Sequence, residues 1–200
     1  MSCAKALSED FGNLFLDPQN SDVVLLCQGE EIRAHRVILC ARSPVLRAML
    51  QNDMPENVRG EIKNDDCDVD VLKEMIRYMY SAKVDREFIK FKELLILANK
   101  CQVEELIKYC GSKLAVSLTK ENALELGVFA ETHNADDLMK DCVTFILDNI
   151  PDSLDWNWKD LLKGSPKMMI EMLQKLLDNE LCRMGYTMQT ETNQINRRGQ

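Results

Sequence analysis

Apolar residues near the amino terminus recur at intervals of three and four, the spacing that places side chains on one face of a helix. They are Leu7, Phe11, Leu14 and Phe15. The predicted helix has only two or three turns, and a helix this short is marginal by itself in water. Its apolar face must therefore pack against the core of the same chain or against another chain.

A β-hairpin is predicted next. Residues 23–27, VVLLC, are continuously apolar and do not alternate, which favours a strand buried on both faces. Gly29 supplies a turn before the strand-like EIRA of residues 31–34. One more short strand is predicted in EIKN, 61–64, after the loop-like segment 52–60, which is rich in Asn, Asp, Pro and Gly.

The stretch 34–50, AHRVILCARSPVLRAML, has helical spacing that is interrupted in the middle. Ser43 is a preferred residue type for a helix N-cap, and Pro44 suits the first helical position. The stretch therefore predicts one helix that ends before Ser43 and a second helix over residues 44–51.

The rest of the chain has helical apolar spacing almost throughout. The predicted helices cover residues 71–80, 91–99, 103–115, 120–131, a segment after Asn134 that ends before Pro151, 155–162 and 167–178. Thr119 and Asn134 are predicted N-caps, and the last four helices are expected to pack as two helical hairpins. Residues 181–200 lose both periodicity and apolar density and are expected to form a mobile tail.

Composition narrows the possible functions. Hydrophobic residues make up 46% of the chain, enough for a folded core, and the formal net charge is -8. A negative chain is poorly suited to nucleic acid, because that affinity depends on neutralising phosphates with Lys and Arg. No apolar run approaches the roughly 20 residues of a membrane span, and the amino terminus lacks a signal peptide. We expect an intracellular protein, in the cytoplasm, the nucleus or both.

His35 and Cys40 raise the question of a nucleophile with its base or a metal site. They lie about 140° apart on a helix, so their side chains do not face each other. The eight cysteines contain no C-x-x-C pair, and the chain has no phosphate-binding glycine motif. We expect buried thiols, no metal, no cofactor and no enzymatic activity; turnover that disappears when His35 or Cys40 is mutated would reverse this.

Two other polar groups admit a structural explanation. Asp65, Asp66, Asp68 and Asp70 lack the spacing of a calcium loop, and acidic residues ahead of a helix are explained by its dipole. His133 lies among carboxylates near a helix end, where we expect a solvated imidazole with a weakly perturbed pKa.

One set of residues resembles the signature of the BTB (POZ) domain: an acidic residue before the first strand, then H-x-x-x-L-x-x-x-S after the hairpin. The matching residues are Asp22, His35, Leu39 and Ser43, followed by Leu46. The stretch 34–50 is similar to the BTB domain of speckle-type POZ proteins, in the MATH-BTB family, and so are LKEMIRYMYSAK, ENALEL and WKDLLKGSP. The likeness covers roughly residues 7–180.

This resemblance implies an α+β fold: a small β-sheet flanked by helical hairpins, followed by an all-α region. It divides the chain into a BTB domain with an N-terminal dimerisation helix (1–117), a shortened BACK-like helical region (118–180) and a tail (181–200). In such domains the first helix and the helix after the hairpin form the dimer interface. The matching residues here are Leu7, Phe11, Leu14 and Ile38, although the alternative that they pack only within the chain remains open.

The resemblance further implies a non-catalytic homodimeric adaptor for a cullin-3 RING ubiquitin ligase. Met54 and Glu56 match the family's hydrophobic-x-Glu motif, which contacts the cullin-3 N-terminal region. A flexible Met can fill a groove on a partner, and Glu can fix orientation through a charge-assisted hydrogen bond. The paired helices in 120–149 would extend this surface.

Several features depart from the family pattern. No MATH-like segment precedes the first predicted helix, so this is a shortened form of a longer protein, or substrate choice resides in a dimer partner, the BACK surface or the tail. An alternative role follows: a scaffold in transcriptional assemblies, or a regulator that heterodimerises with MATH-BTB proteins. Leu173 stands where the family has an aromatic residue for a second self-association surface. The family's basic nuclear signal is reduced to Arg197 and Arg198.

Overall fold

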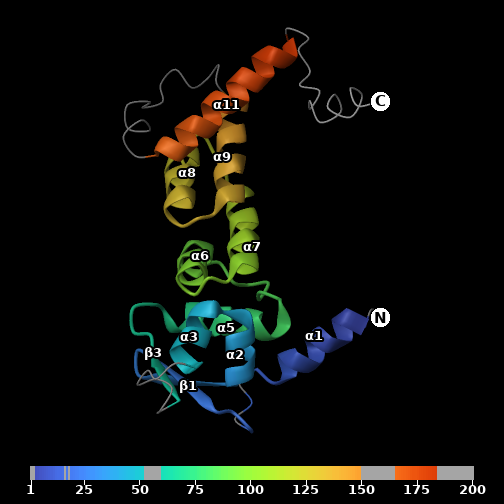
Figure 1. Ribbon diagram of the computed structural model, residues 1–200, viewed down its shortest axis with the longest axis vertical. Coiled ribbons are helices and arrows are strands. Elements are labelled where there is room, and N and C mark those ends of the chain that lie inside the picture. The colour runs from blue at the N-terminus through green and yellow to red at the C-terminus, as the bar shows by residue number, and fades with distance from the viewer. Residues whose placement is uncertain (1–2, 16, 18, 52–59, 150–164, 184–200) are drawn as a thin grey trace, which may run out of the picture.

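The computed structural model describes residues 3–15, 17, 19–51, 60–149 and 165–183. Its elements are α1 (Cys3–Asn13), β1 (Val23–Cys27), β2 (Glu30–Ala34), α2 (Arg36–Arg42), α3 (Pro44–Gln51), β3 (Glu61–Lys63), α5 (Val69–Ser81), α6 (Phe91–Lys100), α7 (Glu104–Ala115), α8 (Ala123–Thr132), α9 (Asp136–Asp148) and α11 (Pro166–Arg183). Figure 1 shows an elongated molecule with the sheet at one end and α8, α9 and α11 at the other. The predicted α+β class is confirmed.

The described part of the chain forms a sheet with strand order β2-β1-β3. β1 pairs with β2 in antiparallel register from Val23 opposite Ala34 to Cys27 opposite Glu30, and it pairs with β3 in parallel. The two residues of the hairpin turn, Gln28 and Gly29, both have positive φ angles, of 50° and 85°. Such turns match the natural twist of paired strands. The predicted hairpin and third strand are confirmed.

The expectation that β1 is buried on both faces is wrong in part. Val23, Leu25 and Cys27 are buried, whereas Val24 and Leu26 on the opposite face are only partly buried. Figure 1 places the helices of this region on one side of the sheet. A sheet covered on one face keeps the other face partly open to solvent, even where its residues are apolar.

The predicted break at Ser43 and Pro44 is confirmed. The Ser43 N–H donates to Leu39 O at the end of α2, at 3.0 Å, and its Oγ accepts the N–H of Leu46 in α3, at 3.1 Å. Ser43 is fully buried, and its hydroxyl donates to the Cys101 carbonyl oxygen at 2.6 Å. This serine therefore starts one helix and also fastens it to the end of α6.

Helix α5 is the centre of the first core. Leu72, Met75 and Ile76 are fully buried, and α5 packs against α1, α2 and α6. Asp68 is the N-cap of α5, and its carboxylate accepts the N–H of Asp70 at 2.9 Å. Asp68 of the acidic run is therefore a helix cap, whereas Asp65 accepts the Gln28 N–H and Asp66 pairs with Lys100. In the described ranges, no three or more His, Cys, Asp or Glu residues are grouped so that they could hold a metal ion.

Beyond α7 the chain forms an all-helical extension. Helix α9 packs against α7. Helices α8 and α9 form an antiparallel pair, and α11 lies against these two helices (Figure 1). Met168 of α11 lies so close to Gly127 of α8 that a Cβ added to this glycine would approach the Met168 sulfur to 2.6 Å. The second predicted hairpin is only partly observable, because residues 155–162 and Pro151 lie outside the described residues.

Two predicted N-caps are wrong. Helix α8 starts at Ala123 rather than Lys120, because the Asn122 side chain accepts the Thr119 N–H, at 2.8 Å, and residues 119–122 form a turn. Asn134 has a φ of 56° and precedes the actual cap position, Ala135. The Asn122 side chain thus serves the turn before α8, whereas the Asn134 side chain donates to Asn99 Oδ1 at 3.2 Å and its positive φ suits a turn residue.

Helix α11 starts at Pro166, as Ser165 and Pro166 predict, but it continues to Arg183, three residues into the segment expected to be a tail. Among the described helices, none is long and apolar enough to cross a membrane.

Candidate interaction surface

The signature residues meet where the hairpin leads into α2. The Asp22 carboxylate accepts the N–H of Arg36, at 2.7 Å, although Asp22 lies fourteen residues earlier. The Tyr80 hydroxyl accepts the His35 N–H at 2.8 Å and lies 2.8 Å from His35 Nδ1. The other ring nitrogen, Nε2, faces Gln19 O at 3.3 Å. These contacts satisfy backbone groups at the start of α2 and anchor it to α5.

His35 and Cys40 are not brought together as a reactive pair. Both ring nitrogens of His35 already have partners in Tyr80 and Gln19. Cys40 is buried in the core, and its carbonyl oxygen accepts from Arg47 Nε at 2.7 Å. The imidazole is therefore a structural group at the hairpin junction, and it is not positioned to activate the thiol.

Burial is the main cause of the pKa shifts of four other thiols and of the second histidine. It raises the pKa of Cys101 to about 11 and that of Cys67, Cys110 and Cys142 to about 12. Such thiols stay protonated at neutral pH and are poor nucleophiles. His133 differs from the expectation of a solvated group, because it is half-buried against the Phe129 ring and burial lowers its pKa.

An exposed apolar row lies on α1 and just beyond it. Leu7, Phe11 and Leu14 are 55%, 37% and 38% exposed. Phe15, predicted on the same face, turns inward and lies 6.0 Å from the Tyr80 ring between centroids. The row splits because α1 ends at Asn13, so the last two residues follow a turn. We call Leu7, Phe11 and Leu14 the α1 face.

Helix α2 adds an exposed residue that the sequence reasoning missed. Val37 is 72% exposed, whereas its predicted neighbour Ile38 is partly buried and packs against the core. A helical wheel would have indicated the exposure of Val37, because this residue lies about 200° around the helix from the buried Leu39. It was masked by the unbroken apolar run VILC, in which periodicity does not single out one residue.

The sequence matches a known domain family over about half of its length. Residues 11–118 match the BTB/POZ domain. The chain belongs to the BTB/POZ family. BTB/POZ domains are protein-interaction domains that mediate self-association and binding to other proteins, and typically not enzymes.

Two curated proteins show the same likeness. TD and POZ domain-containing protein 4 of Mus musculus is 32% identical over 173 residues, which are 85% of this chain and 47% of that protein. Protein maternal effect lethal 26 of Caenorhabditis elegans is 32% identical over 174 residues, 85% of this chain and 44% of its own length. The chain thus spans less than half the length of these relatives. Both alignments are longer than the BTB/POZ match, so the likeness continues into the helical extension.

The predicted site residues fall in different parts of the chain. Leu7 precedes the matched residues 11–118, Phe11 and Leu14 are exposed at their start, and Ile38 on α2 is partly buried against the core. Met54 and Glu56 belong to the segment between α3 and β3 that lies outside the described residues. The surface that the structure does describe is therefore the α1 face and the exposed side of α2.

Proposed function

We propose that this chain is a non-catalytic adaptor that forms a homodimer through its BTB/POZ domain and binds the N-terminal region of cullin-3 in a RING ubiquitin ligase. The observation that supports it most is the α1 face. Helix α1 packs on α5 with its other side and leaves three apolar side chains of Leu7, Phe11 and Leu14 substantially exposed.

Symmetry makes this face energetically useful. Fully burying a Leu or Phe side chain contributes about 1.5–3 kcal/mol. In a twofold dimer each residue of the patch counts twice, because the same surface contributes from both subunits. Part of this gain offsets the lost freedom of association. The half-exposed row of three residues therefore contributes an apolar centre to the proposed dimer contact, and the exposed Val37 on α2 offers further apolar area.

The cullin-binding role rests on the BTB/POZ family and on the motif at Met54 and Glu56. The motif precedes β3, in the segment that follows α3. The extension, with α8 and α9 following directly on α7, would add to the same partner surface as a BACK-like region. Two cullin arms joined by one dimer raise the local concentration of ligase around a target, which increases ubiquitination without any chemistry in this chain.

The dimer is tested by light scattering at micromolar concentration. The wild type is expected at twice the monomer mass, and Leu7→Glu combined with Phe11→Glu is expected at the monomer mass, because two charges per subunit would be buried at the interface. Ile170→Glu is a matched control, since Ile170 on the distant α11 is 56% exposed, like Leu7. A monomeric wild type would refute the dimer.

Cullin binding is tested by calorimetry with the purified cullin-3 N-terminal region. The wild type is expected to bind, and Met54→Ala with Glu56→Ala is expected to lose affinity. Glu31→Ala serves as the control, because Glu31 is an exposed carboxylate on β2, at the opposite edge of the sheet from β3. Unchanged affinity in the double variant would refute the placement of the cullin-binding site at Met54 and Glu56. A wild type that does not bind would refute the cullin-binding role.

A further inference from the structure

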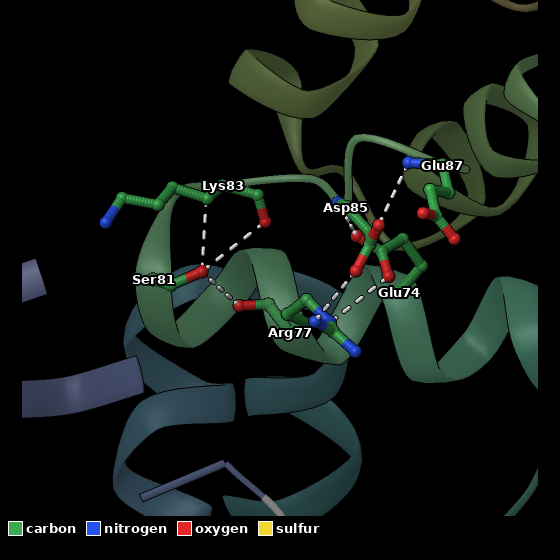
Figure 2. A network of polar contacts seen from close by, with 6 residues as sticks. All are labelled: Glu74, Arg77, Ser81, Lys83, Asp85 and Glu87. Carbon is green, nitrogen blue, oxygen red and sulfur yellow. Dashed lines mark hydrogen bonds and ion pairs between the residues drawn. The ribbon is translucent and has the colours of Figure 1, made fainter. Parts of the chain in front are cut away.

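Arg77 lies where three segments of the chain meet. Its guanidinium carbon lies 5.4 Å from the centre of the Phe15 ring, which follows α1. On its other side Nε lies 3.2 Å from Glu74 Oε2, and Nη1 lies 3.3 Å from Asp85 Oδ2 (Figure 2). One side chain of α5 therefore touches the end of the first helix and the segment that follows α5.

The two carboxylates of this contact accept hydrogen bonds from the backbone. Glu74 is only 4% exposed, and its second carboxylate oxygen accepts the Asp85 N–H at 2.5 Å. Asp85 in turn accepts the Glu87 N–H at 2.9 Å. A buried carboxylate needs a nearby positive charge, because desolvation disfavours its ionised form. Arg77 Nη1 donates to Asp85, whereas the buried Nε faces Glu74 as an ion pair without hydrogen-bond geometry, so Glu74 positions the guanidinium by charge and Asp85 by a hydrogen bond (Figure 2).

The other side of the contact concerns α1. This helix has 11 residues and an exposed apolar face, so its position depends on what it touches on α5. Ser8 donates to the Ser81 carbonyl oxygen at 2.5 Å, and Gly12 lies against the Ser81 side chain. Phe15 is held between Arg77 and Tyr80. Arg77 is the charged member of this set, and its planar guanidinium suits stacking on an aromatic ring.

We propose that Arg77 is the positioning residue for self-association: held by Glu74 and Asp85, it fixes Phe15 and so holds α1 in the orientation that presents Leu7, Phe11 and Leu14 to a second copy of the chain. This inference rests on the proposed dimer. It adds that the geometry of the α1 face is set from α5 and from the segment after it. An open hollow of about 490 Å³ beside Phe15, Arg77 and Asp85 leaves room for Phe15 to move when Arg77 is lost.

The test uses the full chain and two measurements on each variant. Backbone hydrogen exchange of residues 7–13 reports how firmly α1 is docked, and sedimentation equilibrium gives the dimer dissociation constant. In Arg77→Ala we expect exchange in α1 to accelerate about tenfold and the dimer to weaken about tenfold, a factor that corresponds to about 1.4 kcal/mol. Phe15→Leu leaves the Glu74–Arg77 pair intact, so exchange in α5 and the thermal midpoint should change little in that variant.

Three further variants control this experiment. Phe15→Leu keeps an apolar side chain and every charge but removes the ring, so it should reproduce the α1 effect even if Arg77→Ala fails to fold. Arg77→Lys keeps the positive charge without the planar guanidinium, so its α1 exchange rate and dimer dissociation constant should lie between those of the wild type and Arg77→Ala. Lys73→Ala is the matched control, because Lys73 lies on the same helix in an exposed ion pair with Glu30.

The outcomes separate this inference from the proposed function. Unchanged α1 exchange in Arg77→Ala and in Phe15→Leu overturns the positioning role, whatever the oligomeric state. A wild type that stays monomeric overturns the dimer, while α1 exchange in that monomer still decides whether Arg77 holds the helix. Weaker dimers only in variants that also lose α5 protection would mark Arg77 as a general stability residue and overturn the positioning role.

Discussion

The BTB/POZ domain and the helical extension each start a helix at a Ser-Pro dipeptide, yet they satisfy it differently. Ser43 caps α3 with its own hydroxyl and donates to Cys101 O. Ser165 is equally buried, but its hydroxyl contacts the Glu131 carboxylate of α8. That carboxylate also accepts the Met168 and Lys167 N–H groups at 3.2 and 3.3 Å. The same local sequence thus predicts both helix starts, whereas α11 depends on an ionised group of another helix.

The two regions also differ in how they are packed. The first core joins a sheet to α5 and α6 through large, fully buried side chains such as Leu25, Leu72 and Leu95. In the extension, α11 buries Met168 and Met172, and Met168 packs against Gly127 of α8. Fewer buried contacts hold α11, so it should open separately from the BTB/POZ domain.

The largest expected loss of stability comes from a substitution in the first core. Leu25→Ala removes a buried side chain at the centre of the middle strand and should lower the free energy of unfolding by about 2–5 kcal/mol. Urea unfolding followed by circular dichroism measures it. Met168→Ala should instead accelerate hydrogen exchange in α11 with little change in the main urea midpoint. Equal global losses in the two variants would show that both regions unfold as one unit.

The two serines provide a closer comparison. Ser43→Ala should cost about 1–3 kcal/mol, because the buried Cys101 carbonyl oxygen loses its side-chain donor and α3 loses its cap. Ser165→Ala should cost less, since Glu131 keeps its two backbone donors. Thermal unfolding of both variants checks the order. A greater loss in Ser165→Ala would place the main cap of α11 on the serine.

The two carboxylates Glu131 and Glu74 should respond to pH with opposite signs. Burial acts to raise the Glu131 pKa, but hydrogen bonds from Ser165, Met168 and Lys167 outweigh it and lower the pKa below its usual 4.5. Burial raises the pKa of Glu74, only partly opposed by Asp85 N–H and Arg77. The Glu131 contribution is therefore present at neutral pH and lost as the pH falls through its lowered pKa. The Glu74 contribution is present at low pH and lost as the pH rises through its raised pKa.

Glutamine variants test these signs. From pH 4 to pH 7, the stability of Glu131→Gln relative to the wild type should fall, because the wild type gains an ionised cap that Gln lacks. Over the same range the relative stability of Glu74→Gln should rise, because Gln resembles the neutral form. Urea midpoints at several pH values provide the measurement. Parallel slopes for the two variants would contradict the assignment.

The smallest effect is expected on the outer side of α11. Leu173 and Leu177 are 52% and 63% exposed, so Leu173→Ala and Leu177→Ala should each change the free energy of unfolding by no more than about 0.5 kcal/mol. Chemical denaturation is sufficient to check this. A loss above 1.5 kcal/mol would show that another surface covers these side chains in solution.

Local patterns predicted the elements well where a short stretch carries its own signal. The Ser43 break, the hairpin at Gly29 and the start of α11 at Pro166 are all encoded within a few residues. The caps at Thr119 and Asn134 were misjudged, because Asn and Thr serve turns and caps alike. The α1 face was predicted in part, since helical spacing does not tell where α1 ends and Phe15 turns inward.

Long-range contacts were beyond sequence reasoning. Nothing near His35 points to Tyr80, 45 residues later, and nothing near Ser165 points to Glu131. Arg77 is one of many charged residues on a helix, and only the fold brings it between Phe15 and two carboxylates. Such pairs depend on how elements pack, which apolar periodicity does not specify. The sequence pattern therefore does not identify which distant residues form these pairs.

The most direct test of the central claim is the mass of the complex between this chain and the cullin-3 N-terminal region, measured by sedimentation equilibrium. A dimeric adaptor predicts a 2:2 complex for the wild type. Phe11→Asp should reduce it to 1:1, because the α1 face is disrupted while Met54 and Glu56 are intact. A 1:1 wild-type complex, or a 2:2 complex that survives Phe11→Asp, would contradict a dimer formed through the α1 face.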